Sequence, residues 1–168
     1  PHIAYLSLTP DVPRPSLGGL QRCLRRLDDE GYSSIITAAL HPDEAATFLH
    51  AGFVEYDRLR VLSHSLRDLD PPRRRPGPGV RLRRARASDR GPALAADARA
   101  FPPFWRLDGD GLHEALTATP KARFRVAVRR GGVVGYAVTG RAGSQGFLQR
   151  RATDPDVAGT GIGSELVM

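Results

Sequence analysis

Residues 149–168 read QRRATDPDVAGTGIGSELVM, and this stretch indicates the fold of the second half of the chain. Three glycines, Gly159, Gly161 and Gly163, recur at every second position between a strand-like run and the start of a predicted helix. Glycine lets a backbone turn tightly and approach a ligand closely. The free N–H groups in the first turn of a helix favour anions. The pattern therefore predicts a strand, a loop that binds phosphate or pyrophosphate, and a helix.

Two common phosphate-binding loops do not fit this spacing. A dinucleotide-binding loop needs G-x-G-x-x-G after the first strand of a parallel unit, whereas here G-x-G-x-G follows strands that we expect to be antiparallel. A P-loop needs a Lys followed by Ser or Thr, and the loop has none. Taken alone, the loop leaves a flexible glycine-rich turn as the alternative.

The residues ahead of the loop predict alternating strands and helices. Hydrophobic periodicity, capping residues and turn signals mark each element. The expected order is a strand, a helix beginning at Ser88-Asp89, a break, a short second helix and three antiparallel strands. The ranges are Val80–Ala87, Ser88 to about Ala100, Phe101–Trp105, Asp110–Leu116, Arg123–Arg129, Val133–Thr139 and Phe147–Thr153.

With this order of elements, LQRRATDPDVAGTGIGSELV resembles the acetyl-coenzyme A loop of the GCN5-related N-acetyltransferase (GNAT) family, [Gln/Arg]-x-x-Gly-x-[Gly/Ala]. Gly161 and Gly163 take the two glycine positions, and Pro155 takes the proline between strand and loop. Ala158 departs from the pattern, because Gln or Arg is usual there. The resemblance extends over Val80–Met168, roughly half of the chain. It implies an α/β fold of the α+β type, with a mixed, mostly antiparallel sheet flanked by helices.

The resemblance implies an acetyl-CoA-dependent N-acetyltransferase that transfers acetyl to a primary amine. The loop amides would hold the pyrophosphate, and the strand end would pair with the pantetheine arm like an added strand. Ala158 would remove one side-chain contact with the cofactor. The implied cofactor-binding residues are Ala152, Thr153, Ala158, Gly159, Thr160, Gly161, Ile162, Gly163 and Ser164.

The catalytic groups remain unassigned. The acceptor amine must lose a proton, and many family members carry a glutamate for this on the fourth strand. Here that strand reads Gln149-Arg150-Arg151, and the family's usual tyrosine acid would lie beyond Met168. On the substrate side we consider two aromatic and two acidic residues. The alternative for the aromatic residues is a place in the core or in a lid, and the alternative for the acidic residues is a solvated helix end. They are Phe104, Trp105, Asp108 and Glu114, while His113 is expected at the surface and Tyr136 in packing.

The sequence of the front half, residues 1–68, predicts the order strand, helix, strand, helix, strand. It resembles the later part of the same fold, because a helix ending at Gly52-Phe53 precedes a strand. Pro13 and Pro15 remove N–H donors where the glycine loop would lie, so we expect a half-copy that does not bind coenzyme A. The predicted elements are Ile3–Leu8, a helix capped by Ser16 that ends near Gly31, Ser34–Ala38, Asp43–His50 and Phe53–Leu62.

The predicted organisation is a degenerate unit over 1–68, a Pro/Arg/Gly linker over 69–79 (LDPPRRRPGPG) and a GNAT unit over 80–168. Because the glycine loop is followed by only the first turns of a helix, we expect the native chain to continue beyond Met168. The alternative is that the front half packs its strands against the back half in one composite sheet.

The composition of the chain bears on disulfides, metal sites, membrane segments and charge. Cys23 is the sole cysteine and the five histidines are scattered, so neither an internal disulfide nor a metal site is expected. No apolar run approaches the roughly 20 residues that span a bilayer, which predicts a cytoplasmic protein without a membrane partner. The net charge of +7 comes almost wholly from arginine, which we interpret as codon usage in a high-GC genome.

The expected partner is a small-molecule or peptide amine of unknown identity, and a homodimer is left open. Two rival functions remain. The first is a non-catalytic GNAT-fold binding or scaffold protein, which Ala158 and the missing strand acid favour. The second is an arginine-rich nucleic-acid-binding module, although the densest arginine cluster, 73–75, has no interleaved aromatic residues.

Overall fold

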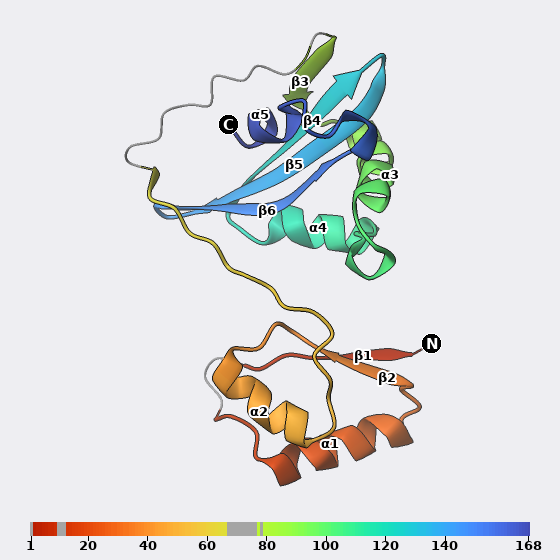
Figure 1. Ribbon diagram of the computed structural model, residues 1–168, viewed down its shortest axis with the longest axis vertical. Coiled ribbons are helices and arrows are strands. Elements are labelled where there is room, and N and C mark those ends of the chain that lie inside the picture. Colours follow the sequence, from red (N-terminus) through yellow and green to blue (C-terminus); the bar gives the residue numbers. More distant parts are fainter. Residues whose placement is uncertain (1, 10–12, 67–76, 78) are drawn as a thin grey trace. The chain divides into compact units, whose positions relative to one another are not determined.

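The computed structural model describes residues 2–9, 13–66, 77 and 79–168 (Figure 1). The chain divides into two compact units, Pro1–Arg67 and Asp68–Met168, and each has its own sheet. Most of the predicted linker over 69–79 lies outside the described residues. None of the helices in the described ranges is long and apolar enough to cross a membrane.

The first unit is a parallel β-α-β arrangement followed by a second helix. Its elements are β1 (Ile3–Leu6), α1 (Leu17–Asp29), β2 (Ser34–Thr37) and α2 (Pro42–His50). The β1 and β2 strands pair in parallel, with Ala4 opposite Ile35. The α1 helix begins as predicted, because the Ser16 hydroxyl accepts a hydrogen bond from the Gly19 N–H at 3.2 Å.

The predicted strand over Phe53–Leu62 is wrong. These residues form no strand, and Val54 and Val61 are 83% and 99% exposed. An alternating pattern forms a strand only when a neighbouring strand takes its backbone hydrogen bonds, and none of the strands in the described ranges is a neighbour of this segment. Phe53 instead packs edge-on against Phe48 of α2, with ring centroids 5.3 Å apart. The half-copy and tandem interpretation stays a prediction.

The second unit holds a four-stranded antiparallel sheet in the order β3-β4-β5-β6, in which β3 is the short green strand of Figure 1 and the other three run from cyan to blue. Its register places Phe124 opposite Val138 and Tyr136 opposite Ala152. The β4–β5 turn has left-handed conformations at Arg130 (φ 51°) and Gly131 (φ 83°), which the tight hairpin requires. The strands are β3 (Val80–Arg84), β4 (Lys121–Arg129), β5 (Gly132–Ala142) and β6 (Gln145–Thr153).

Helices cover both faces of this sheet. Val126 and Ala127 are adjacent and both fully buried, so their side chains enter cores on opposite faces. The α3 (Arg90–Ala100) and α4 (Gly109–Thr117) helices lie on the Val126 face, and α5 (Ile162–Val167) lies on the Ala127 face. The expected α+β fold with a mostly antiparallel sheet flanked by helices is therefore confirmed, as is the order of elements in 80–168, and this sheet is antiparallel throughout.

Two bulges bend the strands near the glycine loop. In β6, Arg150 lies opposite Val138 but Leu148 lies opposite Thr139, so Gln149 is an extra residue. In β5, Val134 is extra in the same way against β4. A bulge increases local twist and redirects the side chains beside it. The β6 bulge directly precedes Arg150, which belongs to the candidate site.

We predict that acid weakens this unit through Asp89, which lies just before α3. Arg83 donates two hydrogen bonds to its carboxylate, at 2.6 and 2.8 Å. The Arg83 bonds, and less so the bond from the Arg86 N–H, outweigh burial and lower the pKa of Asp89 from 3.8 to about 2. The stabilisation is present above pH 3.8 and is lost as pH falls through about 2. Urea unfolding followed by the fluorescence of Trp105 should therefore show a smaller difference between wild type and Asp89→Asn at pH 2 than at pH 5.

Equal differences at the two pH values would contradict this assignment. The comparison with Asp89→Asn is needed because Asp97 and Asp154 also have lowered pKa values and contribute to the acid dependence of wild type and variant alike.

Candidate active site

The glycine loop joins β6 to α5 and has a fixed shape. Asp154 accepts a hydrogen bond from the Asp156 N–H at 3.1 Å, which begins a 3-10 turn over Pro155–Val157. Gly159 and Gly161 then adopt left-handed conformations, with φ of 75° and 86°. Side chains are strained in that region, so the two positions require glycine for the path of the loop. Val157 and Ile162 are buried on either side of the loop and anchor it to the core.

The predicted cofactor residues differ in their exposure to solvent. Ala158, Gly159, Thr160 and Ser164 are exposed, and Gly161 and Gly163 are partly so. Ile162 is only 1% exposed, so its side chain belongs to the core and only its backbone remains for a ligand. Ala152 is 2% exposed and pairs with Tyr136, while Thr153 is half-buried. Their roles in cofactor binding stay predictions.

Arg151 brings a guanidinium to the loop that the sequence analysis did not recognise. A Cβ added to Gly163 would stand 2.8 Å from Arg151 Nη1 and 3.4 Å from Thr153 Oγ1. Glycine at this position therefore leaves room for Arg151 to lie against the first turn of α5. Ala158 lacks the polar side chain that the family pattern has at this position. Arg151 of β6 supplies a positive charge to the loop instead.

The β6 strand has an open edge beside this loop. Among the described residues, β6 has a neighbouring strand on one side only, β5. The Asp154 N–H bonds to the Val134 carbonyl of β5 at 2.9 Å. Backbone groups alternate in direction along an antiparallel strand, so those of the adjacent Thr153 face the open edge. This edge fits an extended ligand that pairs as an added strand.

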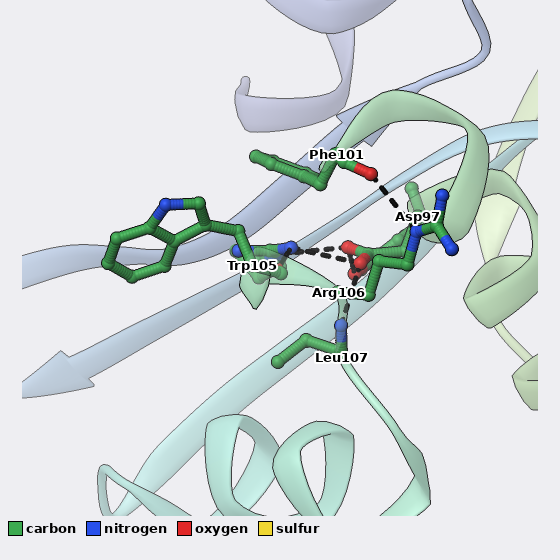
Figure 2. Close-up of polar contacts among 7 residues, drawn as sticks. Asp97, Phe101, Trp105, Arg106 and Leu107 are labelled. Carbon is green, nitrogen blue, oxygen red and sulfur yellow. Dashed lines mark hydrogen bonds and ion pairs between the residues drawn. The ribbon is translucent and has the colours of Figure 1, made fainter. Parts of the chain in front are cut away.

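A buried carboxylate, Asp97 of α3, lies on the other side of β6 at the centre of a hydrogen-bond network (Figure 2). Asp97 is fully buried and accepts four bonds. Its Oδ2 accepts from the Tyr136 hydroxyl at 2.6 Å and from Arg150 Nε at 2.8 Å. Its Oδ1 accepts from the Leu107 N–H and from Arg150 Nη2, both at 2.9 Å.

Arg150 connects this carboxylate to the segment between α3 and α4. Its Nη2 also donates to the Trp105 carbonyl, and its guanidinium lies 3.6 Å from the centre of the Phe101 ring. The side chain of Arg150 is only 15% exposed. The Arg150 guanidinium therefore contacts Asp97 of α3, the Phe101 ring that follows α3 and the Trp105 carbonyl that ends the 3-10 turn.

The network keeps its charges at neutral pH. Burial raises the pKa of Asp97, but hydrogen bonds from Arg150, Tyr136 and Leu107 outweigh it, so the pKa is lowered. Burial and the bond to Asp97 raise the pKa of Tyr136, which therefore stays protonated. Burial lowers the pKa of Arg150, but the interaction with Asp97 raises it by more. With both oxygens occupied, Asp97 is a poor general base.

The sequence analysis did not identify Asp97. The available signal was an acid on an otherwise apolar helix face, since Asp97 follows the buried Ala93 and Ala96 at helical spacing. Its partners lie 39 and 53 residues away along the chain, so no local pattern identifies them. Arg150 was noted only because the strand lacks an acid.

The substrate-side candidates divide into two groups. Phe104 is 41% exposed and packs edge-on against Trp105, with ring centroids 5.0 Å apart, beside the network. Asp108 has a structural role, because it accepts from the Gly111 N–H at 2.8 Å and caps α4. Glu114 and the expected surface residue His113 are exposed on α4, and Tyr136 is fully buried as expected.

A second ion pair joins α3 to the glycine loop. Arg99 donates to Asp154 Oδ2 through Nε at 2.9 Å and through Nη2. Asp154 is 8% exposed. Burial raises the pKa of Asp154, but the hydrogen bonds from Arg99 and from the Asp156 N–H together outweigh burial, so the pKa is lowered. The last turn of α3 thus holds both the loop and the Phe101–Leu107 segment. No cluster of three His, Cys, Asp or Glu residues suited to a metal occurs in the described ranges.

Solved structures that are similar to this chain include the following three. The ribosomal-protein-S18-alanine N-acetyltransferase of Escherichia coli is 17% identical, with a TM-score of 0.46 over 52% of this chain and 54% of its own. The GNAT-like decarboxylase GphF, in complex with isobutyryl-CoA, is 25% identical, with a TM-score of 0.46 over 52% and 55%. A GNAT family acetyltransferase from Brucella melitensis, in complex with acetyl-CoA, is 20% identical, with a TM-score of 0.43 over 52% and 63%.

The matched part of this chain thus spans 54–63% of the length of these three proteins. No protein-family model matches the chain, and no curated protein matches it.

We predict that Asp97→Asn lowers the free energy of unfolding of this unit by about 3 kcal/mol, because it leaves Arg150 as a buried, uncompensated charge. Arg150→Met should cost a similar amount by leaving Asp97 unpaired. The double variant should cost clearly less than the sum of the two, since the pair is removed together. Urea titration followed by Trp105 fluorescence measures the cycle, and additive losses would show that the two side chains act independently.

Proposed function

We propose that the second unit binds acetyl-CoA and catalyses transfer of the acetyl group to a primary amine. The observation that carries this proposal is the glycine loop, with left-handed Gly159 and Gly161 and a crowded Gly163 between an antiparallel edge strand and α5. The proposal is supported by the resemblance of this stretch to the GNAT pattern, residue by residue at Pro155, Gly161 and Gly163.

Each part of the site has a role in this proposal. The amides of 159–164 hold the pyrophosphate, and the Arg151 guanidinium adds a charge-assisted contact. The open edge at Thr153 pairs with the pantetheine arm and directs it along β6. Acetyl-CoA, when bound there, supplies the thioester as an activated acyl donor. The exposed face of Phe104 offers an apolar surface for the acceptor, beside the strand that binds the cofactor.

In this proposal, solvent removes the proton from the amine. The acid that the family often carries on this strand is replaced by Gln149 and Arg150, and Asp97 is occupied by four hydrogen bonds. Water at the open edge of β6 accepts the proton in this proposal. The rate should then follow the ionisation of the acceptor amine itself.

A non-catalytic coenzyme A-binding protein is the alternative, and the absence of an acid at Gln149-Arg150-Arg151 of β6 favours it. The two functions share the cofactor and differ in turnover. Isothermal titration with acetyl-CoA and with coenzyme A therefore comes first, followed by an acetylation assay on a panel of amines, peptides and proteins. Binding without acetylation of any amine would support the alternative, and no binding at millimolar ligand would exclude both.

We predict that wild type binds acetyl-CoA and that Arg151→Ala weakens binding about tenfold, the loss expected for one charge-assisted hydrogen bond. Gly161→Val should abolish binding, because a β-branched residue is strained at φ of 86°. Arg123→Ala is the matched control, since it removes an exposed arginine from β4. An equal loss in Arg123→Ala would mean that net charge, rather than the position of Arg151, determines affinity.

A further inference from the structure

The segment between α3 and α4, Phe101–Leu107, owes its shape to side-chain contacts. Its only regular structure is a 3-10 turn over Pro103–Trp105. Pro102 and Pro103 provide no N–H groups, so the segment has few backbone hydrogen bonds of its own. Besides the backbone bond from the Phe101 N–H to the Asp97 carbonyl at 3.0 Å, three contacts that involve side chains join it to the remainder of the unit. They are the Leu107 N–H to Asp97, the Trp105 carbonyl to Arg150 and the Phe101 ring under Arg150.

These three ties depend on one ion pair. Asp97 is held in place by both Nε and Nη2 of Arg150, and Arg150 contacts Trp105 and Phe101 directly. A planar guanidinium can make two parallel bonds to a carboxylate, donate to a carbonyl and stack on a ring at the same time. A lysine ammonium at this position would keep the charge without that geometry.

We propose that Arg150 is a positioning residue that fixes the Phe101–Leu107 segment against β6. The β6 strand that carries Arg150 ends at Thr153 and the glycine loop, which form the cofactor side of the proposed active site. The segment carries Phe104 and Trp105, which form its acceptor side. The Asp97–Arg150 pair thereby aligns the acceptor surface with the cofactor, and this inference rests on the proposed function.

Trp105 is the only tryptophan in the chain, so its fluorescence reports this segment directly. The full chain carrying Arg150→Lys is compared with wild type and with Arg83→Lys. The control removes the same bidentate Arg–Asp geometry at the start of α3, where Arg83 binds Asp89. Acrylamide quenching of Trp105 is measured with and without saturating acetyl-CoA, and titration calorimetry gives the affinity for acetyl-CoA.

We expect Arg150→Lys to raise the quenching constant of Trp105 at least twofold, because the segment detaches from β6. Acetyl-CoA should alter quenching in wild type and in Arg83→Lys but not in Arg150→Lys. The Kd for acetyl-CoA should stay within about threefold in all three proteins, since Arg150 does not contact the loop. If Arg150→Lys does not fold, Phe101→Leu, which removes only the stacked ring, should raise quenching in the same direction.

The proposal is overturned if the quenching constant of Trp105 in Arg150→Lys equals that of wild type. It is also overturned if Arg83→Lys raises this constant as much as Arg150→Lys does. The second result would mean that any loss of an Arg–Asp pair loosens the segment. Failure of the proposed function has a different signature. In that case no variant binds acetyl-CoA, and quenching of the free proteins still decides whether Arg150 fixes the segment.

Discussion

The buried carboxylate of Asp97 is the constraint on which the second unit depends. A charge removed from water is tolerated only when hydrogen bonds and an opposite charge replace its hydration. Asp97 receives its four bonds from β5, β6 and Leu107 at the end of the segment between α3 and α4. Those elements can satisfy it only in one relative arrangement, so the requirement fixes α3, the end of the sheet and the Phe101–Leu107 segment together.

Arginine has a structural role here that composition alone does not indicate. Three Arg–Asp pairs attach α3 and the turn before it to the sheet and the loop, through Arg83, Arg99 and Arg150. The fully buried apolar residues of α3 are small, Ala93 and Ala96, and they bury little apolar area. Directional bidentate pairs supply the register that such a face lacks. We interpreted the arginine excess as codon usage, yet these three arginines have specific partners.

The sequence predicted what local patterns determine. Alternation located the strands of 80–168, glycine marked the turn at Gly131 and the loop at Gly161, and Ser16 located the start of α1. Features that depend on distant partners were not predictable in this way. The segment Phe53–Leu62 alternates like a strand but lacks a partner strand among the described residues. Asp97 looks like a solvated helix residue until Arg150, 53 positions later, is placed beside it.

The two sides of the candidate site differ in how they are stabilised. The glycine loop depends on backbone conformations at Gly159 and Gly161 and on buried Val157 and Ile162, which a single stretch of chain encodes. The Phe101–Leu107 segment depends on Asp97 and Arg150, which come from separate elements. A change in one of these two residues therefore alters this segment without changing the residues that shape the glycine loop.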